Sequence, residues 1–393
     1  MRKPPASRGS AGLRILHIAD RVLTPDLDGA SARDRAILQA FQRLGCRITF
    51  VAHHPDSFYA FARTVARDIA SLEAAGIEVA RPPETPSVEA LLAERGRDFH
   101  LVLMSPYPIA HRYLPAVRRH APAALAVYDA MDVGHVQHYR RAKATGNVPD
   151  LKRAIEAKRQ ELALARLADA VLVCSDEDRE AFHRLCPGAR LVVASHVVPP
   201  RPASMRLEGR SGLIFLGSFP HLANVDAMTY FVREVLPAAR AALPELELTI
   251  VGLDPRGDLA PLVGPGVTLA GWVPDLDEVF ARARVFVAPL RYGAGIKVKV
   301  LDSLARGVPV VATPLAAEGL HLCDGESALI AEGPEEFAAA VVHLHGDPPL
   351  WRRLVDGGHA VLDRHFSESA MDASLAPLLA GTLERREHDG AAR

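Results

Sequence analysis

The stretch APLRYGAGIKVKVLDSLARGVPVVATPLAAEGL, residues 288–320, decides the fold of its half of the chain. An apolar run ends at Leu290, a loop with Gly293 and Gly295 follows, and a helical segment ends at Gly307 before a second apolar run. Strand, loop, helix and strand in this order form a βα unit, in which the helix connects two parallel strands. The stretch therefore predicts a parallel sheet.

The same alternation extends through the whole chain. Most of its short apolar runs are continuous rather than alternating, as in strands that are buried on both faces, and helical segments such as 32–44 and 226–242 separate them. The predicted strands are 14–19, 47–52, 100–105, 124–129, 170–174, 190–194, 212–217, 246–252, 267–271, 284–290, 308–313 and 328–331. Two such series predict an α/β protein with two Rossmann-like doubly wound domains facing across a cleft.

Composition indicates where the domains end. The segment VVPPRPASMRLEGRSG at 197–212 is rich in proline and glycine, as linkers are, and it separates the two series. The expected divisions are a disordered N-terminus at 1–12, an N-terminal domain at 13–200, a linker at 201–212, a C-terminal domain at 213–370, and a helical segment with a tail at 371–393.

Charge and composition exclude several classes of protein. The 393 residues carry 46 Lys and Arg against 47 Asp and Glu, and this balance argues against general nucleic-acid binding. The four cysteines have no C-x-x-C spacing, which favours neither a disulfide framework nor a zinc site. No apolar stretch reaches the ~20 residues of a membrane span, and no signal-peptide core precedes the first strand. We therefore expect a cytoplasmic protein.

The loop at Gly293–Gly295 is a candidate anion site. Free backbone N–H groups and the positive end of the helix dipole meet where a glycine-rich loop enters a helix. Arg291, Lys297 and Lys299 add three cations within nine residues, which suits a diphosphate better than a carboxylate. Asp302 follows Lys299 by about one helical turn and can accept hydrogen bonds from ribose hydroxyls. The alternative is a βα turn with solvated lysines.

Several segments of the C-terminal half are similar to those of a known family. DSLARGVPVVAT (302–313), in which an acidic residue opens a helix, and EGL (318–320) follow the glycine-rich loop, and IFLGSFPHLANVDAM (214–228) and GWVPDLDEVFARARVFVAPLR (271–291) precede it. These segments resemble the GT-B nucleotide-sugar glycosyltransferases, most closely the retaining family 4 enzymes (group 1). The resemblance is weaker in the N-terminal half.

The resemblance implies a hexosyltransferase of cell-envelope polysaccharide or glycoconjugate biosynthesis. A hexose would move from a nucleoside diphosphate sugar to an acceptor hydroxyl with retention of configuration, without a metal or another cofactor. Lys299 would be catalytic, and the backbone near Val273 would face the base. The implied donor-binding residues are Gly217, Ser218, Asn224, Val273, Arg291, Gly293, Ala294, Gly295, Ile296, Lys297 and Asp302.

Two departures from the family's pattern leave the sugar open. The usual pair of glutamates falls at Ala294 and Asp302, so a shorter carboxylate remains for the ribose and none for distal hydroxyls of the donor sugar. The Arg and Lys that many members carry after the first strand of the second domain are absent, and Ser218 and Asn224 lie near those places. Neither the base, the sugar, the acceptor nor the oligomeric state follows from the sequence.

Two candidate sites lie in the N-terminal half. Gly29, Ala30 and Ser31 precede a predicted helix and form a second candidate anion loop on the acceptor side, and a helix start with Ser31 as N-cap is the alternative. The resemblance implies that Asp132 or His135 lines the donor–acceptor junction as a catalytic residue. A histidine without a catalytic role is the alternative for His135.

A basic stripe bears on the partners. Lys152, Arg159 and Arg166 recur every seven residues on one predicted helix, where they either contact anionic lipid weakly or form a solvated face. The expected partners are therefore the donor and a sugar or lipid-linked acceptor, with peripheral membrane contact at the cytoplasmic face. A non-catalytic scaffold and a nucleotide-sugar epimerase are the alternative functions.

Overall fold

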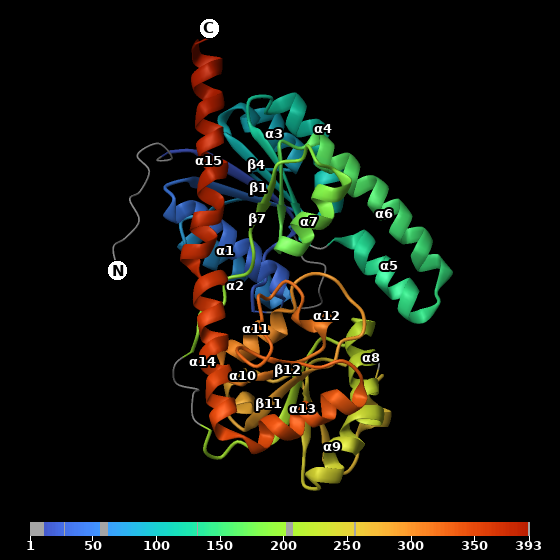
Figure 1. Ribbon diagram of the computed structural model, residues 1–393. Coiled ribbons are helices and arrows are strands. Elements are labelled where there is room, and N and C mark those ends of the chain that lie inside the picture. The colour runs from blue at the N-terminus through green and yellow to red at the C-terminus, as the bar shows by residue number, and fades with distance from the viewer. Residues whose placement is uncertain are drawn as a thin grey trace. The chain divides into compact units, whose positions relative to one another are not determined.

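The computed structural model describes residues 12–26, 28–55, 62–131, 133–201, 207–254 and 257–391. The chain forms two compact units, each with one parallel sheet and flanking helices (Figure 1). Unit 1 comprises residues 1–135, 152–197 and 368–393, and unit 2 comprises 136–151 and 198–367. The two parallel-sheet α/β domains predicted from the alternating pattern are thus present.

Unit 1 is built on a seven-stranded parallel sheet with the order β3-β2-β1-β4-β5-β6-β7. Its strands are β1 (Arg14–Arg21), β2 (Arg47–His54), β3 (Glu78–Ala80), β4 (Leu101–Ser105), β5 (Leu125–Ala130), β6 (Ala170–Val173) and β7 (Leu191–Val193). Its helices are α1 (Gly29–Arg43), α2 (Ala62–Ala74), α3 (Val88–Arg95), α4 (Tyr107–His120), α6 (Val148–Leu167), α7 (Asp176–Leu185) and α15 (Glu368–Ala391), and α5 (Gly134–Thr145) and α6 begin in one unit and end in the other. Every residue of β4 and β5 is buried, as their continuous apolar pattern predicts.

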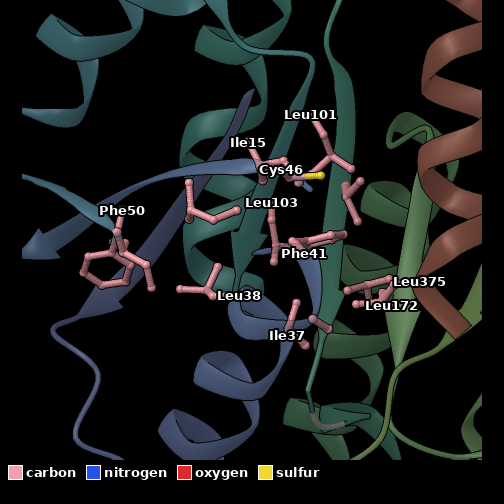
Figure 2. Close-up of a cluster of buried hydrophobic side chains, with 14 of the residues drawn as sticks. Ile15, Ile37, Leu38, Phe41, Cys46, Phe50, Leu101, Leu103, Leu172 and Leu375 are labelled. Atoms are coloured by element: carbon pink, nitrogen blue, oxygen red, sulfur yellow. The ribbon is translucent and has the colours of Figure 1, made fainter. Parts of the chain in front are cut away.

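The last helix of the chain packs on unit 1. Leu375 of α15 lies in the same buried cluster as Ile37 and Phe41 of α1 (Figure 2). Arg43 at the end of α1 donates hydrogen bonds to Asp372 at 2.8 and 3.0 Å, which adds an ion pair at the edge of this contact. The segment predicted as the C-terminal helical tail therefore packs on unit 1, the unit that contains the N-terminal sheet.

Unit 2 is built on a six-stranded parallel sheet with the order β10-β9-β8-β11-β12-β13. Its strands are β8 (Gly212–Leu216), β9 (Leu248–Val251), β10 (Val267–Gly271), β11 (Ala283–Ala288), β12 (Val310–Ala312) and β13 (Leu329–Ile330). Its helices are α8 (Leu222–Tyr230), α9 (Leu236–Ala242), α10 (Leu276–Phe280), α11 (Val298–Ala305), α12 (Pro314–Ala317), α13 (Pro334–Gly346) and α14 (Pro348–His365). β8 and β11 are neighbours in the middle of this sheet, and the strand order reverses between them.

Two elements differ from the prediction. The helix expected over 226–242 is interrupted by a π-helical segment, Phe231–Val235, because Pro237 has no N–H and its ring clashes with the carbonyl of the preceding turn. Strand β3 was not predicted, since three residues at a sheet edge are too short for a recognisable pattern. All of the strands that were predicted are present, and most of them are shorter than predicted by one to three residues.

The units also differ from the expected domain boundaries. Residues 136–151 belong to unit 2 although they lie within the predicted N-terminal domain, and residues 368–391 belong to unit 1. Packing against a distant segment decides both placements, and the local sequence carries no information on it. The predicted disordered N-terminus lies outside the described residues except for Gly12, as do residues 202–206 of the linker.

Candidate functional site

The switch point of the second sheet positions the candidate site. From β8 the chain continues to β9 on one side of the sheet, and from β11 it continues to β12 on the other side. Ligands of open α/β sheets bind at the carboxyl ends of strands where the strand order reverses in this way. The residues that follow these two strand ends, 217–224 and 289–299, are therefore the ones to examine.

Lys299 links the two sides of the switch point. Its ammonium group on α11 donates a hydrogen bond to the side-chain oxygen of Asn224 on α8 and lies 4.7 Å from the centre of the Phe215 ring. Asn224 in turn donates to the backbone oxygen of Ser218 at 2.7 Å. Burial, reinforced by the charge of Lys297, lowers the pKa of Lys299 to about 7. An anion at this point would favour the charged form.

The glycine-rich loop presents free amides. Gly293 and Gly295 have φ of +142° and +69°, and their carbonyl oxygens each accept a hydrogen bond from a cationic side chain, at 3.1 and 2.7 Å. In a trans peptide the N–H points away from the carbonyl, so the amides of Ala294 and Ile296 face away from these cations. Neither amide donates a hydrogen bond to another described residue. They are available for an anion.

A carboxylate lies beside this loop. Arg140 of α5, within unit 2, donates to Glu318 at 2.5 and 2.7 Å, and its Nη1 also donates to the carbonyl oxygen of Gly293 at 3.1 Å. The Lys297 ammonium, which donates to Gly295, is 4.0 Å from the same carboxylate. Burial raises the pKa of Glu318, but the hydrogen bonds from Arg140 together with the charges of Arg140 and Lys297 outweigh burial and leave that pKa below its usual value.

Two residues of the predicted cation and ribose set have other partners. Arg291 donates to Asp226 of α8 at 2.9 and 2.5 Å and lies over the Tyr230 ring, so a carboxylate already neutralises its charge. Asp302 was expected to open a helix, but α11 begins at Val298 directly after the loop. Asp302 lies in the middle of that helix and accepts a hydrogen bond from Arg306 at 3.0 Å.

Gly217 and Val273 are the remaining residues predicted to bind the donor. Gly252 approaches Gly217 so closely that a Cβ atom at Gly252 would lie 1.6 Å from the Gly217 oxygen, and its φ of +134° also requires glycine. Val273, two residues after edge strand β10, is half-buried. Its neighbour Trp272, which the prediction did not include, has 60% of its surface exposed.

Comparison with known families concerns this same region. Residues 210–347 match the family described as "Glycosyl transferases group 1". We refer to this matched segment, about a third of the chain, as the group 1 domain. The group 1 domain contains every residue of the switch-point site named above except Arg140. That arginine comes from α5 and had no signal in the sequence, because 178 residues separate it from Glu318.

Curated relatives match the chain in part. A lipopolysaccharide core biosynthesis glycosyltransferase, LpsE, of Rhizobium meliloti is 33% identical over 150 residues, which are 36% of this chain and 44% of LpsE. A GDP-mannose-dependent α-(1-6)-phosphatidylinositol monomannoside mannosyltransferase of Mycolicibacterium smegmatis is 29% identical over 231 residues, 53% of this chain and 58% of that protein. The chain thus spans about half the length of these relatives.

Solved structures match nearly the whole chain. Sucrose-phosphate synthase from Thermosynechococcus elongatus has a TM-score of 0.68 at 16% identity, over 96% of this chain and 100% of that one. Anabaena HepE, solved in complex with UDP-glucose, has a TM-score of 0.62 at 14% identity, over 94% and 100%. At these identities the likeness concerns the fold alone. The fold is that of GT-B glycosyltransferases, and it extends over both units of the chain.

Outside the group 1 domain, the loop at Gly29–Ser31 is a capped helix start. Asp28 is the N-cap of α1, and its carboxylate accepts hydrogen bonds from the N–H and the hydroxyl of Ser31 at 2.7 and 2.9 Å. The alternative to the anion loop named Ser31 as the N-cap, but Ser31 is the third residue of the helix. The Asp28 carboxylate would repel an anion at this point, so the geometry favours the cap over an anion loop.

His135 at the start of α5 is held by a buried carboxylate. Glu161 of α6 accepts hydrogen bonds from the His135 Nδ1 at 2.6 Å and from the Gly134 N–H at 2.8 Å. The contact fixes the ring and leaves Nε2 for another partner. Glu161 was not predicted, because nothing local distinguishes it from the other acidic residues of its helix. Asp132, the other predicted catalytic residue, lies outside the described residues.

A second buried polar cluster lies at the strand ends of unit 1. Arg33 of α1 makes a bidentate ion pair with Asp129 at 2.8 and 2.9 Å and donates to the Ala194 oxygen at 2.7 Å. Ser105 donates to the same carboxylate at 2.9 Å. Burial lowers the pKa of the neighbouring His17 to about 4, so this histidine is neutral at physiological pH. The pairing of Arg33 and Asp129 joins α1 to β5.

Proposed function

We propose that the protein is a glycosyltransferase that transfers a hexose from a nucleoside diphosphate sugar to an acceptor hydroxyl. The observation that carries the proposal is the pair of free amides at Ala294 and Ile296 in the same group 1 domain as Lys299 at the switch point. The UDP-glucose complex of HepE supports a nucleotide-sugar donor. The names of the two curated relatives support a role in making cell-envelope glycoconjugates.

Each part of the donor has a candidate contact. The diphosphate binds the loop amides and the Lys299 ammonium, and Lys297 supplies a second positive charge nearby. Asp302 accepts hydrogen bonds from the ribose with the oxygen that Arg306 leaves available, and the backbone of Val273 faces the base. Arg291 contributes less than the lysines, because Asp226 already holds it.

The reaction breaks the bond between the anomeric carbon and the diphosphate oxygen and forms a bond to the acceptor oxygen. Negative charge develops on the leaving diphosphate, where fixed amides and the Lys299 cation stabilise the transition state. The acceptor oxygen attacks the face of the sugar that the diphosphate leaves, and the proton of its hydroxyl passes to the leaving phosphate, so no protein nucleophile is needed and the configuration is retained. These fixed charges take the place of a metal, and we expect activity to persist in EDTA.

The acceptor is proposed to be a sugar or a lipid-linked sugar at the cytoplasmic face of a membrane. His135, which Glu161 orients, is the group proposed to bind a substrate hydroxyl or phosphate oxygen. Because Nδ1 of His135 is bonded to Glu161, Nε2 is the ring atom that would form the hydrogen bond to the substrate.

Nucleotide binding tests the function. Trp272 is exposed beside Val273 while Trp351 is 1% exposed, so base binding should change the emission of Trp272. We expect one nucleoside diphosphate of a panel (UDP, GDP, ADP, CDP, dTDP) to quench this emission and, at 100 times its Kd, to stabilise the protein by about 2.7 kcal/mol. W272F should lose the quenching and keep the stabilisation.

The outcomes of this test separate the functions. No stabilisation by any nucleotide or nucleotide sugar would contradict the proposal. Turnover of the donor without an acceptor would favour an epimerase. Donor binding without transfer to any member of a broad acceptor panel would favour a scaffold.

Helix α6 carries the surface proposed for membrane contact. No helix of the described residues is long and apolar enough to cross a bilayer. Val148, Leu151 and Ile155 recur at helical spacing on α6 with 62%, 42% and 65% of their surfaces exposed, and the exposed Lys152 and Lys158 lie among them. Apolar and basic side chains exposed on one helix suit an anionic bilayer surface. The predicted stripe included Lys152 and omitted the apolar residues.

We expect the protein to co-sediment with phosphatidylcholine vesicles only when they contain phosphatidylglycerol, and to dissociate at high salt. K152E together with I155S should abolish the binding, whereas R47E, an exposed charge reversal on β2, should not. Binding that survives the double substitution would move the contact surface away from α6.

A further inference from the structure

We propose that Glu318 binds hydroxyl groups of the donor's sugar and thereby selects which sugar is transferred, with Arg140 and Lys297 as the residues that position it. The inference rests on the proposed function, because it assigns the sugar-binding group of the same site.

The position of the carboxylate carries the first step. One nitrogen, Arg140 Nη1, donates both to Glu318 and to the carbonyl oxygen of Gly293, so the carboxylate is two hydrogen bonds away from the loop. The N–H of that same peptide is the free amide of Ala294, the proposed diphosphate contact, and it lies on the side opposite the carbonyl. A sugar joined to that diphosphate begins one bond beyond it. Only this peptide group and the Arg140 guanidinium separate Glu318 from the proposed diphosphate contact, and we infer that a hexose attached to the diphosphate reaches the carboxylate.

The charge of the carboxylate carries the second step. A carboxylate beside a diphosphate site would repel the ligand. Two cations next to Glu318, Arg140 at 2.5 Å and Lys297 at 4.0 Å, offset this repulsion. Its pKa is below the usual value, so it stays ionised and can only accept hydrogen bonds. Among the parts of a nucleoside diphosphate sugar, hydroxyl groups are the donors that such a group binds.

The remaining capacity of the carboxylate carries the third step. The paired guanidinium uses one lone pair of each oxygen, and an ionised carboxylate offers about four such positions. The Glu318 side chain keeps 30% of its surface exposed, so a ligand can reach the unused positions. A carboxylate fixed by a bidentate arginine accepts from hydroxyls only in certain directions, which distinguishes epimeric sugars.

The substitution Glu318→Gln tests this role. The measured quantity is the ratio of two affinities, that of a nucleotide sugar and that of its own nucleoside diphosphate, for UDP-glucose, UDP-N-acetylglucosamine and GDP-mannose. We expect E318Q to lower this ratio about tenfold for the best ligand while the diphosphate binds as tightly as in the parent or more tightly, because Arg140 loses its ionised partner. E335Q, an exposed glutamate on α13, should leave both affinities unchanged.

The outcomes separate three cases. An equal loss of both affinities in E318Q would make Glu318 a residue that only positions the loop, and two unchanged affinities would remove it from the sugar site; either result overturns the inference while the proposed function stands. A parent protein that binds none of the nucleotides would contradict the proposed function itself. Retained diphosphate binding also shows that the variant is folded.

Discussion

Replacing Lys299 with alanine is expected to weaken nucleoside diphosphate binding by about 10–100-fold, since a charge-assisted hydrogen bond to phosphate is lost. Binding of the nucleoside should change by less than about threefold, because the contacts proposed for the base and the ribose are made by other residues, Val273 and Asp302. Titration calorimetry with both ligands measures the difference. K299M, which keeps apolar packing against Phe215, should behave like the alanine variant.

The same residue makes binding depend on pH. The pKa of Lys299 is about 7 in the free protein, and a bound diphosphate raises it, so affinity should fall as the pH rises from 7 to 9. The terminal phosphate of the ligand titrates near 6, below this window. K299R keeps its charge throughout and should flatten the profile. If K299A and R291A both bind the diphosphate as tightly as the parent, the assignment of the loop as the diphosphate site is wrong. R291A alone should have the smaller effect, because Asp226 neutralises that arginine.

The second large effect concerns stability. Arg33→Met should lower the free energy of unfolding by about 3–5 kcal/mol, because it leaves the Asp129 carboxylate, with no exposed surface, without its bidentate partner. The carbonyl of Ala194 loses its donor as well. Calorimetry should record a fall of roughly 10 °C in the unfolding midpoint. R47M, at an exposed arginine on β2, should leave the midpoint unchanged.

Two further measurements tie that loss to the uncompensated charge. Without Arg33, burial of the Asp129 carboxylate would favour its neutral form, so the deficit of R33M should shrink as the pH is lowered from 7 to 5. R33M combined with D129N removes the buried charge and should recover part of the stability. A deficit that is independent of pH and persists in the double variant would assign the effect to packing.

The features of the fold that could be predicted from the sequence are those that depend on residues adjacent in the chain. β4, β5 and the strands of unit 2 depend on runs of apolar residues that must be buried on both faces, and this pattern is present in the sequence itself. The π-helical segment at Phe231–Val235 and the short strand β3 depend on one proline and one edge position, which a pattern of hydrophobicity does not record.

The site divides in the same way. The glycine-rich loop and Lys299 were predicted because a strand, two glycines and a helix start are adjacent in sequence. Arg291 was expected to face a diphosphate, and only the fold brings Asp226 of a different helix against it. Glu318 is part of the quoted EGL segment without an assigned role, and its partner Arg140 is 178 residues away.

By itself the sequence determined two parallel-sheet α/β domains and a loop with free amides at the carboxyl end of a strand, because backbone geometry and burial on both faces follow from local residue types. The tertiary structure alone decided which charges are available to a ligand. Arg291 is neutralised by Asp226, Lys299 is held with a lowered pKa, and Glu318 is kept ionised by Arg140. Electrostatic interactions depend on distance and burial in space, and neither quantity is determined by separation along the chain.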